Sequence, residues 1–283
     1  MSKIATIGFF DGVHRGHRFL FAQLQEQARL HELTPIIYTF KQHPKQVLIG
    51  HSPAMLTTLD ERLYFLESFA EVRALDFAKV QELTAEQFML YLYSQEDVRI
   101  LLMGYDHRFG SDRLKGFSEY EKIARKIGLR VIRAHECLVD GLDVSSTRIR
   151  KLLNEGNILQ ANRLLGYTYS LAGIVEHGNG IGRQIGFPTA NISFSSQKEL
   201  PMSGVYLAFI KLDGVEYMSV VNIGTNPTVG NKHVTVEAHL IDYNDNLYGK
   251  HIEVAFVDFI REERKFNSLL ELQEQIAKDI ASI

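Results

Sequence analysis

The chain is poor in cysteine: Cys137 is the only one among 283 residues. It therefore has no intrachain disulfide framework and no cysteine-rich zinc site, which is typical of a reducing compartment. No excess of positive charge is present, because 31 Lys and Arg face 34 Asp and Glu, for a formal net charge of -3. This balance argues against broad nucleic-acid binding. The sequence also lacks a signal-peptide pattern and any apolar run that spans a bilayer. We therefore expect a cytoplasmic protein with no nucleic-acid or membrane partner.

The first half alternates short apolar runs with amphipathic segments. Capping boxes predict helices that begin at Thr84, with Gln87, and at Ser118, with Glu121, while Gly128 ends the second of these. This alternation predicts a parallel sheet covered by helices on both faces. The expected strands are 4–10, 35–40, 72–77, 98–103 and 129–134. Two further helices are expected: one follows the first strand and ends near residue 31, and the other covers 60–70.

The second half begins with an expected helical pair over 145–166, broken at Gly156. Apolar and polar residues then alternate over 234–240, which is strand periodicity. Asp213-Gly214 predicts a tight hairpin between apolar segments. Successive strands without intervening helices favour a closed antiparallel barrel.

A final helix is expected over 268–283, with a buried stripe that consists of Leu269, Leu272, Ile276 and Ile280. We place the domain boundary near Leu165, which gives domains 1–165 and 166–283.

A glycine-rich turn, Gly8 to His17, lies where the first strand ends and the first helix begins. Ligands of open α/β sheets bind beyond the carboxyl ends of strands, and a helix N-terminus attracts phosphate. Gly12 lets the backbone approach closely, and His14 and His17 offer hydrogen-bond donors to phosphate oxygens. Two alternatives are a glycine turn with two surface histidines and a zinc pair, although no third ligand is nearby in the sequence.

Two further polar segments, 104–110 and 145–148, follow the fourth and fifth expected strands at the same edge. The hydroxyls of Ser146 and Thr147, with the guanidinium of Arg148, suit a triphosphate at a helix start. An ordinary N-cap is the alternative for these hydroxyls taken alone.

This half resembles the nucleotidyltransferase superfamily with the HxGH signature, here His14 to His17, and its second signature, Ser145 to Arg148. It is most similar to the bacterial FMN adenylyltransferase module, also through 39–44, 56–58 and 106–110. The resemblance implies a Rossmann-like domain. It also implies nucleotide and flavin pockets shaped by Gly8, Asp11, Gly104, Asp106 and Phe109. The chain departs from many members at Phe9, Gln42 and Phe117.

A second glycine-rich segment ends in Pro-Thr-Ala-Asn, at 188–191. It lacks the Gly-Lys-Ser/Thr of a Walker loop. Thr189 and Asn191 lie two residues apart, so in an extended segment they point the same way and their oxygens suit Mg²⁺. The alternative is an ordinary glycine-rich loop of the barrel.

Glu237 lies on the polar face of the alternating segment 234–240, between the motifs 222–228 and 242–249. A carboxylate beside Mg-ATP is able to accept the proton of an attacking hydroxyl. The alternative is a solvated strand carboxylate.

This half resembles riboflavin kinase, a six-stranded barrel with a C-terminal helix, along nearly its whole length. The resemblance implies ATP-phosphate contacts from Gly182, Arg183 and Gly186, a metal at Thr189 and Asn191, a base at Glu237, and flavin contacts from Arg261 and Phe266.

The whole chain resembles the bifunctional bacterial riboflavin kinase/FAD synthetase family. The resemblance implies two reactions: riboflavin and Mg-ATP give FMN in the second domain, and FMN and ATP give FAD and pyrophosphate in the first. Riboflavin, FMN and ATP are the expected small-molecule partners. Two alternatives stay open: a kinase whose first domain is degenerate or specific for another substrate, and a non-catalytic flavin-binding module.

Overall fold

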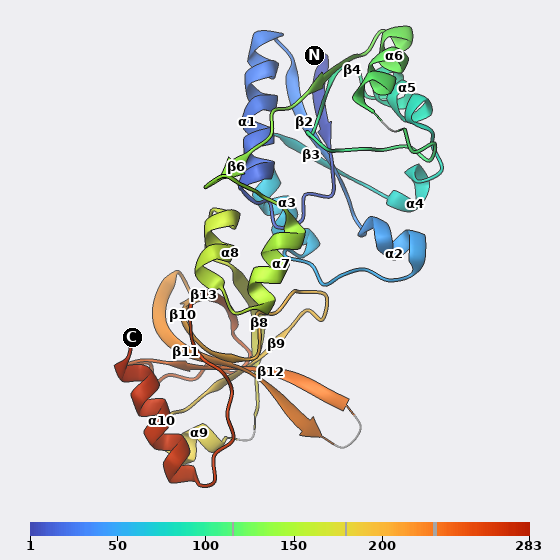
Figure 1. Ribbon diagram of the computed structural model, residues 1–283. Helices are drawn as coiled ribbons and strands as arrows, with labels where there is room; N and C mark the ends of the chain where they lie inside the picture. The colour runs from blue at the N-terminus through green and yellow to red at the C-terminus, as the bar shows by residue number, and fades with distance from the viewer. Residues whose placement is uncertain (115, 179, 229–230) are drawn as a thin grey trace. The chain divides into compact units, whose positions relative to one another are not determined.

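The computed structural model describes residues 1–114, 116–178, 180–228 and 231–283, without the side chains of 181, 225–228 and 231–233. The chain divides into two compact units, Met1–Ser146 and Thr147–Ile283, and each is described by itself. Figure 1 shows a helix-covered sheet in the first unit and a barrel in the second.

The first unit is built on a five-stranded sheet in the order β3-β2-β1-β4-β5, and all its pairings are parallel. The expectation of a parallel sheet is confirmed, and the observed strands start or end up to three residues from the expected bounds. The strands are β1 (Lys3–Ile7), β2 (Thr34–Phe40), β3 (Glu71–Leu75), β4 (Val98–Met103) and β5 (Arg130–Arg133).

Helices cover both faces of this sheet (Figure 1), and each face has its own apolar core. On one face α1 buries Leu20, Leu24 and Ala28, as their spacing predicts. On the other, α5 and α6 bury Phe88 and Tyr120. The helices are α1 (Arg15–Leu30), α2 (Pro44–Ile49), α3 (Leu59–Glu67), α4 (Phe77–Val80), α5 (Ala85–Gln95) and α6 (Phe117–Ile127), and a small hairpin, β6 (Leu138–Val139) and β7 (Leu142–Asp143), follows.

The capping predictions have mixed outcomes. The Thr84–Gln87 box is present, and Gly128 ends α6 with a left-handed φ of 86°. The expected cap at Ser118 is wrong, because the N-cap residue of α6 is Gly116, two residues earlier. The Glu119 carboxylate accepts the Gly116 N–H at 3.0 Å, so it satisfies the helix start that Ser118 was expected to cap.

The second unit contains a closed barrel in the order β10-β11-β12-β9-β8-β13, as the sequence predicts. Asp213 and Gly214 form the β10–β11 turn with φ of 51° and 82°. Along β12, Val236, Ala238 and Leu240 are buried and alternate with more exposed neighbours. The strands are β8 (Ser170–Glu176), β9 (Ala190–Phe194), β10 (Gly204–Leu212), β11 (Val215–Thr228), β12 (Asn231–Leu240) and β13 (His251–Arg261).

Two helices, α7 (Ser146–Asn154) and α8 (Ile158–Leu165), precede the barrel and are separated at Gly156, as expected. They pack on the barrel: Asn162 Nδ2 donates to the Phe256 carbonyl at 2.9 Å, and Met202 N donates to the Leu153 carbonyl at 2.9 Å. For this reason both helices form one compact unit with the barrel.

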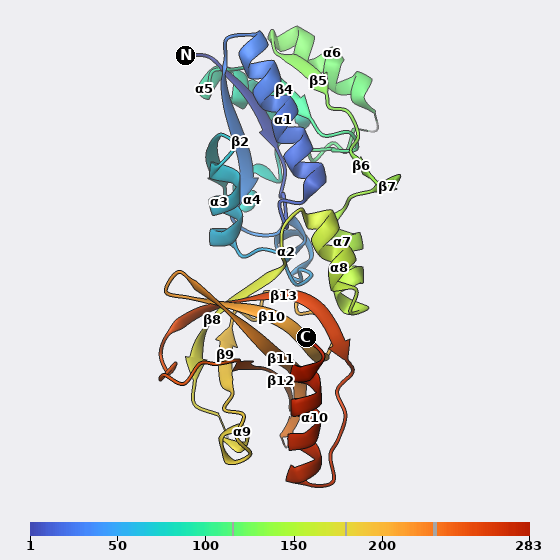
Figure 2. The same ribbon diagram turned by 90° about the vertical axis from the view of Figure 1, so that its left-hand side faces the viewer.

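The terminal helix α10 (Leu269–Ala281) lies beside the barrel, and a short helix α9 (Ile181–Gln184) lies nearby (Figure 2). Ser268 caps α10, but its expected apolar stripe is only partly buried, and Leu269 is 51% exposed. The stripe faces a cavity rather than a filled core, because Leu272 and Ile276 line an opening described below. The most buried side chain of α10 is instead Asp279.

Candidate active sites

The His14–His17 turn caps the start of α1. His14 is the N-cap residue, and its Nδ1 accepts the His17 backbone N–H at 3.4 Å. The two rings stack with their centroids 3.6 Å apart and an angle of 19° between planes. The sequence pattern therefore places both imidazoles together at a helix N-terminus.

Burial keeps both histidines uncharged. Removal from water lowers the pKa of His14 to about 3 and the pKa of His17 well below its usual value, and the His14 charge would lower that of His17 further. Neutral imidazoles each carry one N–H donor. Among the described residues, His17 Nδ1 is buried without a hydrogen-bond partner, and no third side chain joins the pair to form a metal cluster. The pair is thus suited to donate hydrogen bonds to phosphate oxygens.

Asp11 fixes the turn that carries these histidines. Its carboxylate, 3% exposed, accepts the backbone N–H groups of Leu56 and Thr57 at 3.1 and 3.0 Å, and the Thr57 hydroxyl at 3.1 Å. Gly12, with φ of 78°, donates its N–H to the same hydroxyl at 3.0 Å. The hydrogen bonds of Asp11 therefore hold the turn in place, and Thr57 is a partner that the sequence motif alone does not assign.

Ser146, the first residue of α7, reaches the same turn. Its hydroxyl donates to the Asp11 carbonyl at 2.9 Å. Thr147 and Arg148 follow in the first turn of α7. Gly8 lies just after β1, where an added Cβ would lie 2.6 Å from the Phe10 ring, so a side chain does not fit without a shift.

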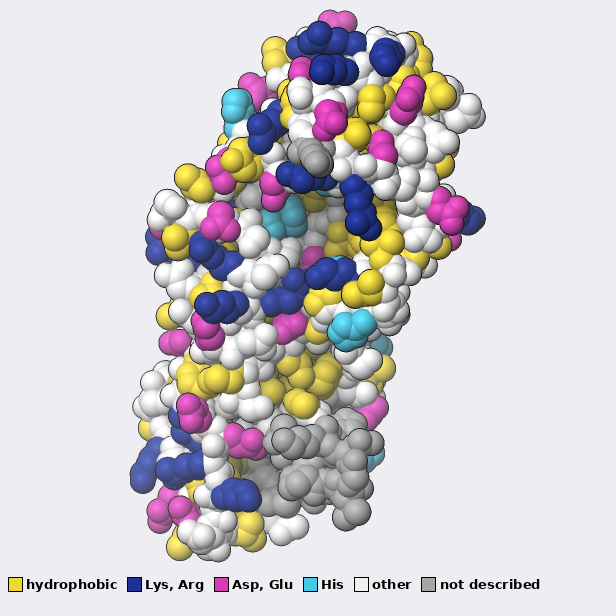
Figure 3. Space-filling model, turned by 45° about the vertical axis from the view of Figure 1, so that its right-hand side comes forward, with side chains coloured by type: hydrophobic (Ala, Val, Ile, Leu, Met, Phe, Trp, Pro, Cys, Tyr) yellow, Lys and Arg dark blue, Asp and Glu magenta, His cyan; other side chains and the backbone are white. Residues whose placement is uncertain are grey.

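A cavity of about 530 Å³ opens beyond the carboxyl ends of β1 and β2. Five phenylalanines contribute to its walls, and Figure 3 shows a hollow in this unit with Lys and Arg side chains around it. Phe109 lines the cavity, and its backbone N–H and carbonyl both bond to the Tyr120 hydroxyl. Asp106, which the resemblance assigns to a substrate pocket, is exposed and does not line it. The aromatic wall consists of Phe9, Phe40, Phe77, Phe88 and Phe109.

In the barrel, the glycine-rich segment packs directly on Thr189 and Asn191. A Cβ added at Gly182 would lie 3.2 Å from Thr189 Oγ1, and one added at Gly178 would lie 1.9 Å from Asn191 Nδ2. The glycines therefore permit a close approach between this loop and both side chains. Gly186 follows α9 with a left-handed φ of 85° and lines none of the barrel cavities described here.

One barrel cavity, of about 270 Å³, contains Glu237. Burial raises the pKa of the Glu237 carboxyl above its usual value, and the charge of Glu263 raises it further. Thr189, Gly182 and Phe266 line the same cavity, as does Asn222, which pairs with Glu237 across β11 and β12. The sequence analysis missed His239 in this cavity, although its spacing of two from Glu237 places it on the same face of β12.

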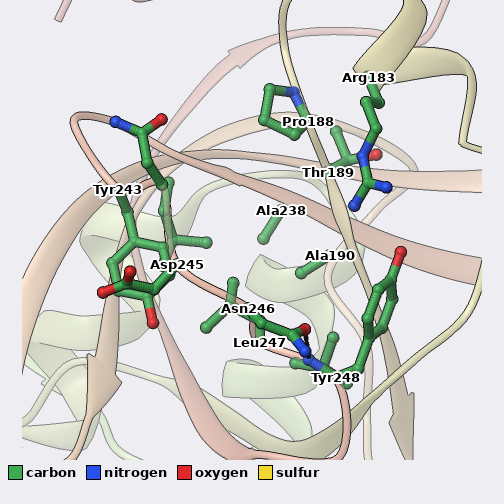
Figure 4. Close-up of a pocket in the computed structure, with 13 residues that line it drawn as sticks. Arg183, Pro188, Thr189, Ala190, Ala238, Tyr243, Asp245, Asn246, Leu247 and Tyr248 are labelled. Atoms are coloured by element: carbon green, nitrogen blue, oxygen red, sulfur yellow. Dashed lines mark hydrogen bonds between the residues drawn. The ribbon is translucent and has the colours of Figure 1, made fainter.

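A second cavity, of about 300 Å³, adjoins Thr189 from another direction. Figure 4 shows Arg183 and Tyr248 on one side of it, and Tyr243 and Asp245 across from them. Thr189 is therefore common to both barrel cavities. The remaining side chains of the motif 222–228, from 225 onward, lie outside the described residues.

Arg261 lines the Glu237 cavity but is held by an acidic partner that the sequence analysis missed. Its Nε and Nη2 donate to the Asp279 carboxylate at 2.9 and 2.8 Å. The Arg261 guanidinium carbon lies 5.9 Å from the Phe266 ring centroid, so the two expected flavin residues do lie together.

The fold and the sites define a class. The first domain is a parallel α/β fold with neutral hydrogen-bond donors at a strand end, and the barrel has a carboxylate in one of two adjoining cavities. This combination is typical of a two-domain phosphate-transferring enzyme. A family model for FAD synthetase matches residues 1–148, and one for riboflavin kinase matches 165–283.

Relatives extend over nearly the whole chain. A bifunctional riboflavin kinase/FMN adenylyltransferase from Escherichia coli K12 is 38% identical over 98% of this chain and 90% of its own length. One from Haemophilus influenzae is 36% identical over 97% and 91%. The chain therefore belongs to the family of bifunctional riboflavin kinases/FMN adenylyltransferases, and it catalyses both reactions.

A solved structure shares the fold of the whole chain. It is described as a macrolide-efflux protein from Streptococcus pneumoniae, with a TM-score of 0.90 and 30% identity over 99% of this chain and 93% of that one. Within the described part of this chain, no helix is long and apolar enough to cross a membrane.

Proposed function

We propose that the two reactions are divided between the two sets of cavities, with FAD made at the His14–His17 turn and FMN made at Glu237. The observation that carries this proposal is the position of Glu237 and Thr189 in one barrel cavity while Thr189 also borders a second. Two adjoining cavities suit two substrates that must react with each other. We assign riboflavin to the cavity with Phe266 and ATP to the cavity with Arg183.

In the kinase step, the ribityl hydroxyl of riboflavin attacks the γ-phosphorus of ATP, and Glu237 takes the hydroxyl proton. The raised pKa of Glu237 makes it a stronger base than an exposed glutamate, which matches this role. Gly182 and Arg183 supply donors beside the phosphates, and Gly186 allows the turn that returns the loop to the barrel. Arg261 acts through its ion pair, which holds α10 and Phe266 beside the flavin.

We assign Mg²⁺ to Thr189 and Asn191. Both residues offer neutral oxygens and lie against the glycine-rich loop. This small donor set fits an ion that keeps few protein ligands and binds largely through substrate phosphates. When bound with ATP, the ion would neutralise charge on the transferred phosphoryl group.

In the adenylylation step, the FMN phosphate attacks the α-phosphorus of ATP and pyrophosphate leaves. The neutral His14 and His17 donate hydrogen bonds to the oxygens on which charge develops, and Gly8 and Gly12 allow close approach. We infer that Asp11 serves by holding the turn and that Ser146, Thr147 and Arg148 hold the triphosphate. The flavin lies in the aromatic cavity beside Phe109, and we keep Asp106, which precedes the lining residue His107 in the chain, as a further flavin contact.

Separation of the two activities tests this assignment. His17→Ala should lower FAD formation from supplied FMN by a factor of at least 10², the loss typical of removing one transition-state donor, and leave riboflavin phosphorylation unchanged. Glu237→Gln should do the reverse. Chromatographic separation of riboflavin, FMN and FAD measures both. A folded variant of either kind that loses both activities would contradict the division.

We further propose 1–165 and 166–283 as the functional domains of a cytoplasmic enzyme. Because α7 and α8 bond to the barrel, a fragment 147–283 should be more resistant to urea than 166–283, while both retain kinase activity. Equal stability of the two fragments would show that these helices contribute nothing to the kinase barrel.

A further inference from the structure

Phe9 lies two residues after β1, in the wall of the aromatic cavity. Two contacts fix its ring. The Arg62 guanidinium carbon lies 4.0 Å from the ring centroid. The His43 ring meets it edge-on, with the centroids 4.7 Å apart and an angle of 71° between planes.

Arg62 is an unusual residue for the interior. It lies in α3 and has 0% exposure, and Leu66 is the other buried residue of this helix. Its Nη2 donates to the Phe40 carbonyl at 2.6 Å. Among the described residues, its Nε and Nη1 have no hydrogen-bond partner. A buried cation with unpaired donors is costly, and an aliphatic side chain at the same position would avoid that cost.

The charge of Arg62 persists at neutral pH. Burial lowers its pKa to about 10, and the nearby Asp11 charge opposes that change. A desolvated guanidinium attracts an aromatic face more strongly than an exposed one does. The retained cation therefore holds the Phe9 ring in one orientation.

The second contact of Phe9, with His43, connects it to α2, which forms another part of the cavity wall. His43 is the N-cap of α2, and its Nδ1 accepts the Lys45 N–H at 3.1 Å. Pro44 and Leu48 of α2 line the cavity, yet α2 has no buried residue of its own. The Phe9 ring thus connects a buried cation to a loosely packed helix at the cavity edge.

We propose that Phe9 is a specificity-determining residue for the flavin ring in the adenylylation reaction and that Arg62 is its positioning residue. The proposal rests on the assignment of this cavity to FMN. Phe9 contacts the flat flavin ring directly, as aromatic pairs favour. Arg62 does not line the cavity, so it acts through Phe9.

The test is steady-state adenylylation by the full chain, followed as pyrophosphate release with FMN and ATP varied separately. Phe9→Leu should raise the KM for FMN about tenfold, which corresponds to about 1.4 kcal/mol. The kcat and the KM for ATP should stay unchanged. Arg62→Met should raise the KM for FMN in the same way, and Arg62→Lys should do so less.

The KM for FMN of the double variant, Phe9→Leu with Arg62→Met, should be no higher than that of the more impaired single variant. The reason is that Arg62 acts on the flavin only through the Phe9 ring. Phe69→Leu is the matched control: this ring packs on Phe21 in the other core of the sheet, so the KM for FMN should not change. Thermal melts report whether each variant folds. If Arg62→Met does not fold, Arg62→Lys and Phe9→Leu decide the question.

Three outcomes would overturn the inference. An unchanged KM for FMN in Phe9→Leu would remove Phe9 from the flavin contact. Additive effects in the double variant, or a change in kcat or in the KM for ATP in Arg62→Met, would show that Arg62 meets the reacting phosphates itself. In all three cases the wild-type chain still forms FAD, whereas wild-type failure to form FAD would instead defeat the proposed function.

Discussion

The ion pair between Arg261 and Asp279 joins the last strand of the barrel to α10, and its removal gives a quantitative prediction. Asp279 is 3% exposed, while the Arg261 side chain is 20% exposed. Breaking a buried pair by removing one partner costs about 3–5 kcal/mol. Since water still reaches part of Arg261, we expect Asp279→Ala to cost about 3 kcal/mol, at the lower end of that range.

For a unit of this size, roughly 3 °C is lost for each kcal/mol, so the barrel should melt roughly 10 °C earlier. The cavity that contains Glu237, which we assign to riboflavin, should also lose its shape, because Leu272 and Ile276 of α10 line it. We therefore expect a raised KM for riboflavin below the melting temperature. Thermal unfolding followed by circular dichroism measures the first effect, and steady-state kinase assays with varied riboflavin measure the second.

Lys278→Ala is the matched control, since it removes a charge from the exposed side of the same helix. It should change stability by less than about 0.5 kcal/mol. Replacement of both partners, Arg261→Met with Asp279→Leu, should recover most of the loss, because no uncompensated charge remains. An Asp279→Ala variant as stable as Lys278→Ala would refute the reasoning.

Two other predictions concern the kinase reaction. Removal of the Glu263 charge by Glu263→Gln should lower the pKa of Glu237, so the acid limb of the kcat/KM profile should move to lower pH. A limb that stays in place or moves upward would exclude Glu263 as a cause of the raised pKa. Gly178→Ala should lower kcat/KM for ATP at least tenfold, because its Cβ would lie 1.9 Å from Asn191 Nδ2, and FAD formation from FMN should be unaffected. Normal phosphorylation by that variant would contradict the close packing of the loop.

Much of the fold could be predicted from local sequence signals. The parallel sheet follows from the alternation of apolar runs and helices, and the β10–β11 hairpin from Asp213-Gly214, because both signals act over a few residues. The start of α6 was predicted wrongly for a physical reason. Ser118 has the right chemistry for a cap, but the Glu119 carboxylate accepts the backbone N–H of Gly116, so the helix is capped two residues earlier.

The sites were less accessible from sequence, because their supporting residues are far apart in the chain. His14, His17 and Glu237 belong to recognisable motifs, whereas Arg62 and Asp279 read as ordinary charged helix positions. Periodicity predicts solvent for a charge beside an apolar stripe. Only the tertiary fold places Asp279 against a guanidinium and Arg62 beneath a ring.

The stacked, uncharged imidazoles at the start of α1 have a consequence for turnover. They attract oxyanions by oriented dipoles and not by net positive charge, so this attraction should depend little on ionic strength. A cationic pair would also bind the departing pyrophosphate tightly, because pyrophosphate carries more negative charge than the AMP group that is transferred. Under the proposed assignment, two neutral rings would assist the transfer and then release the inorganic product.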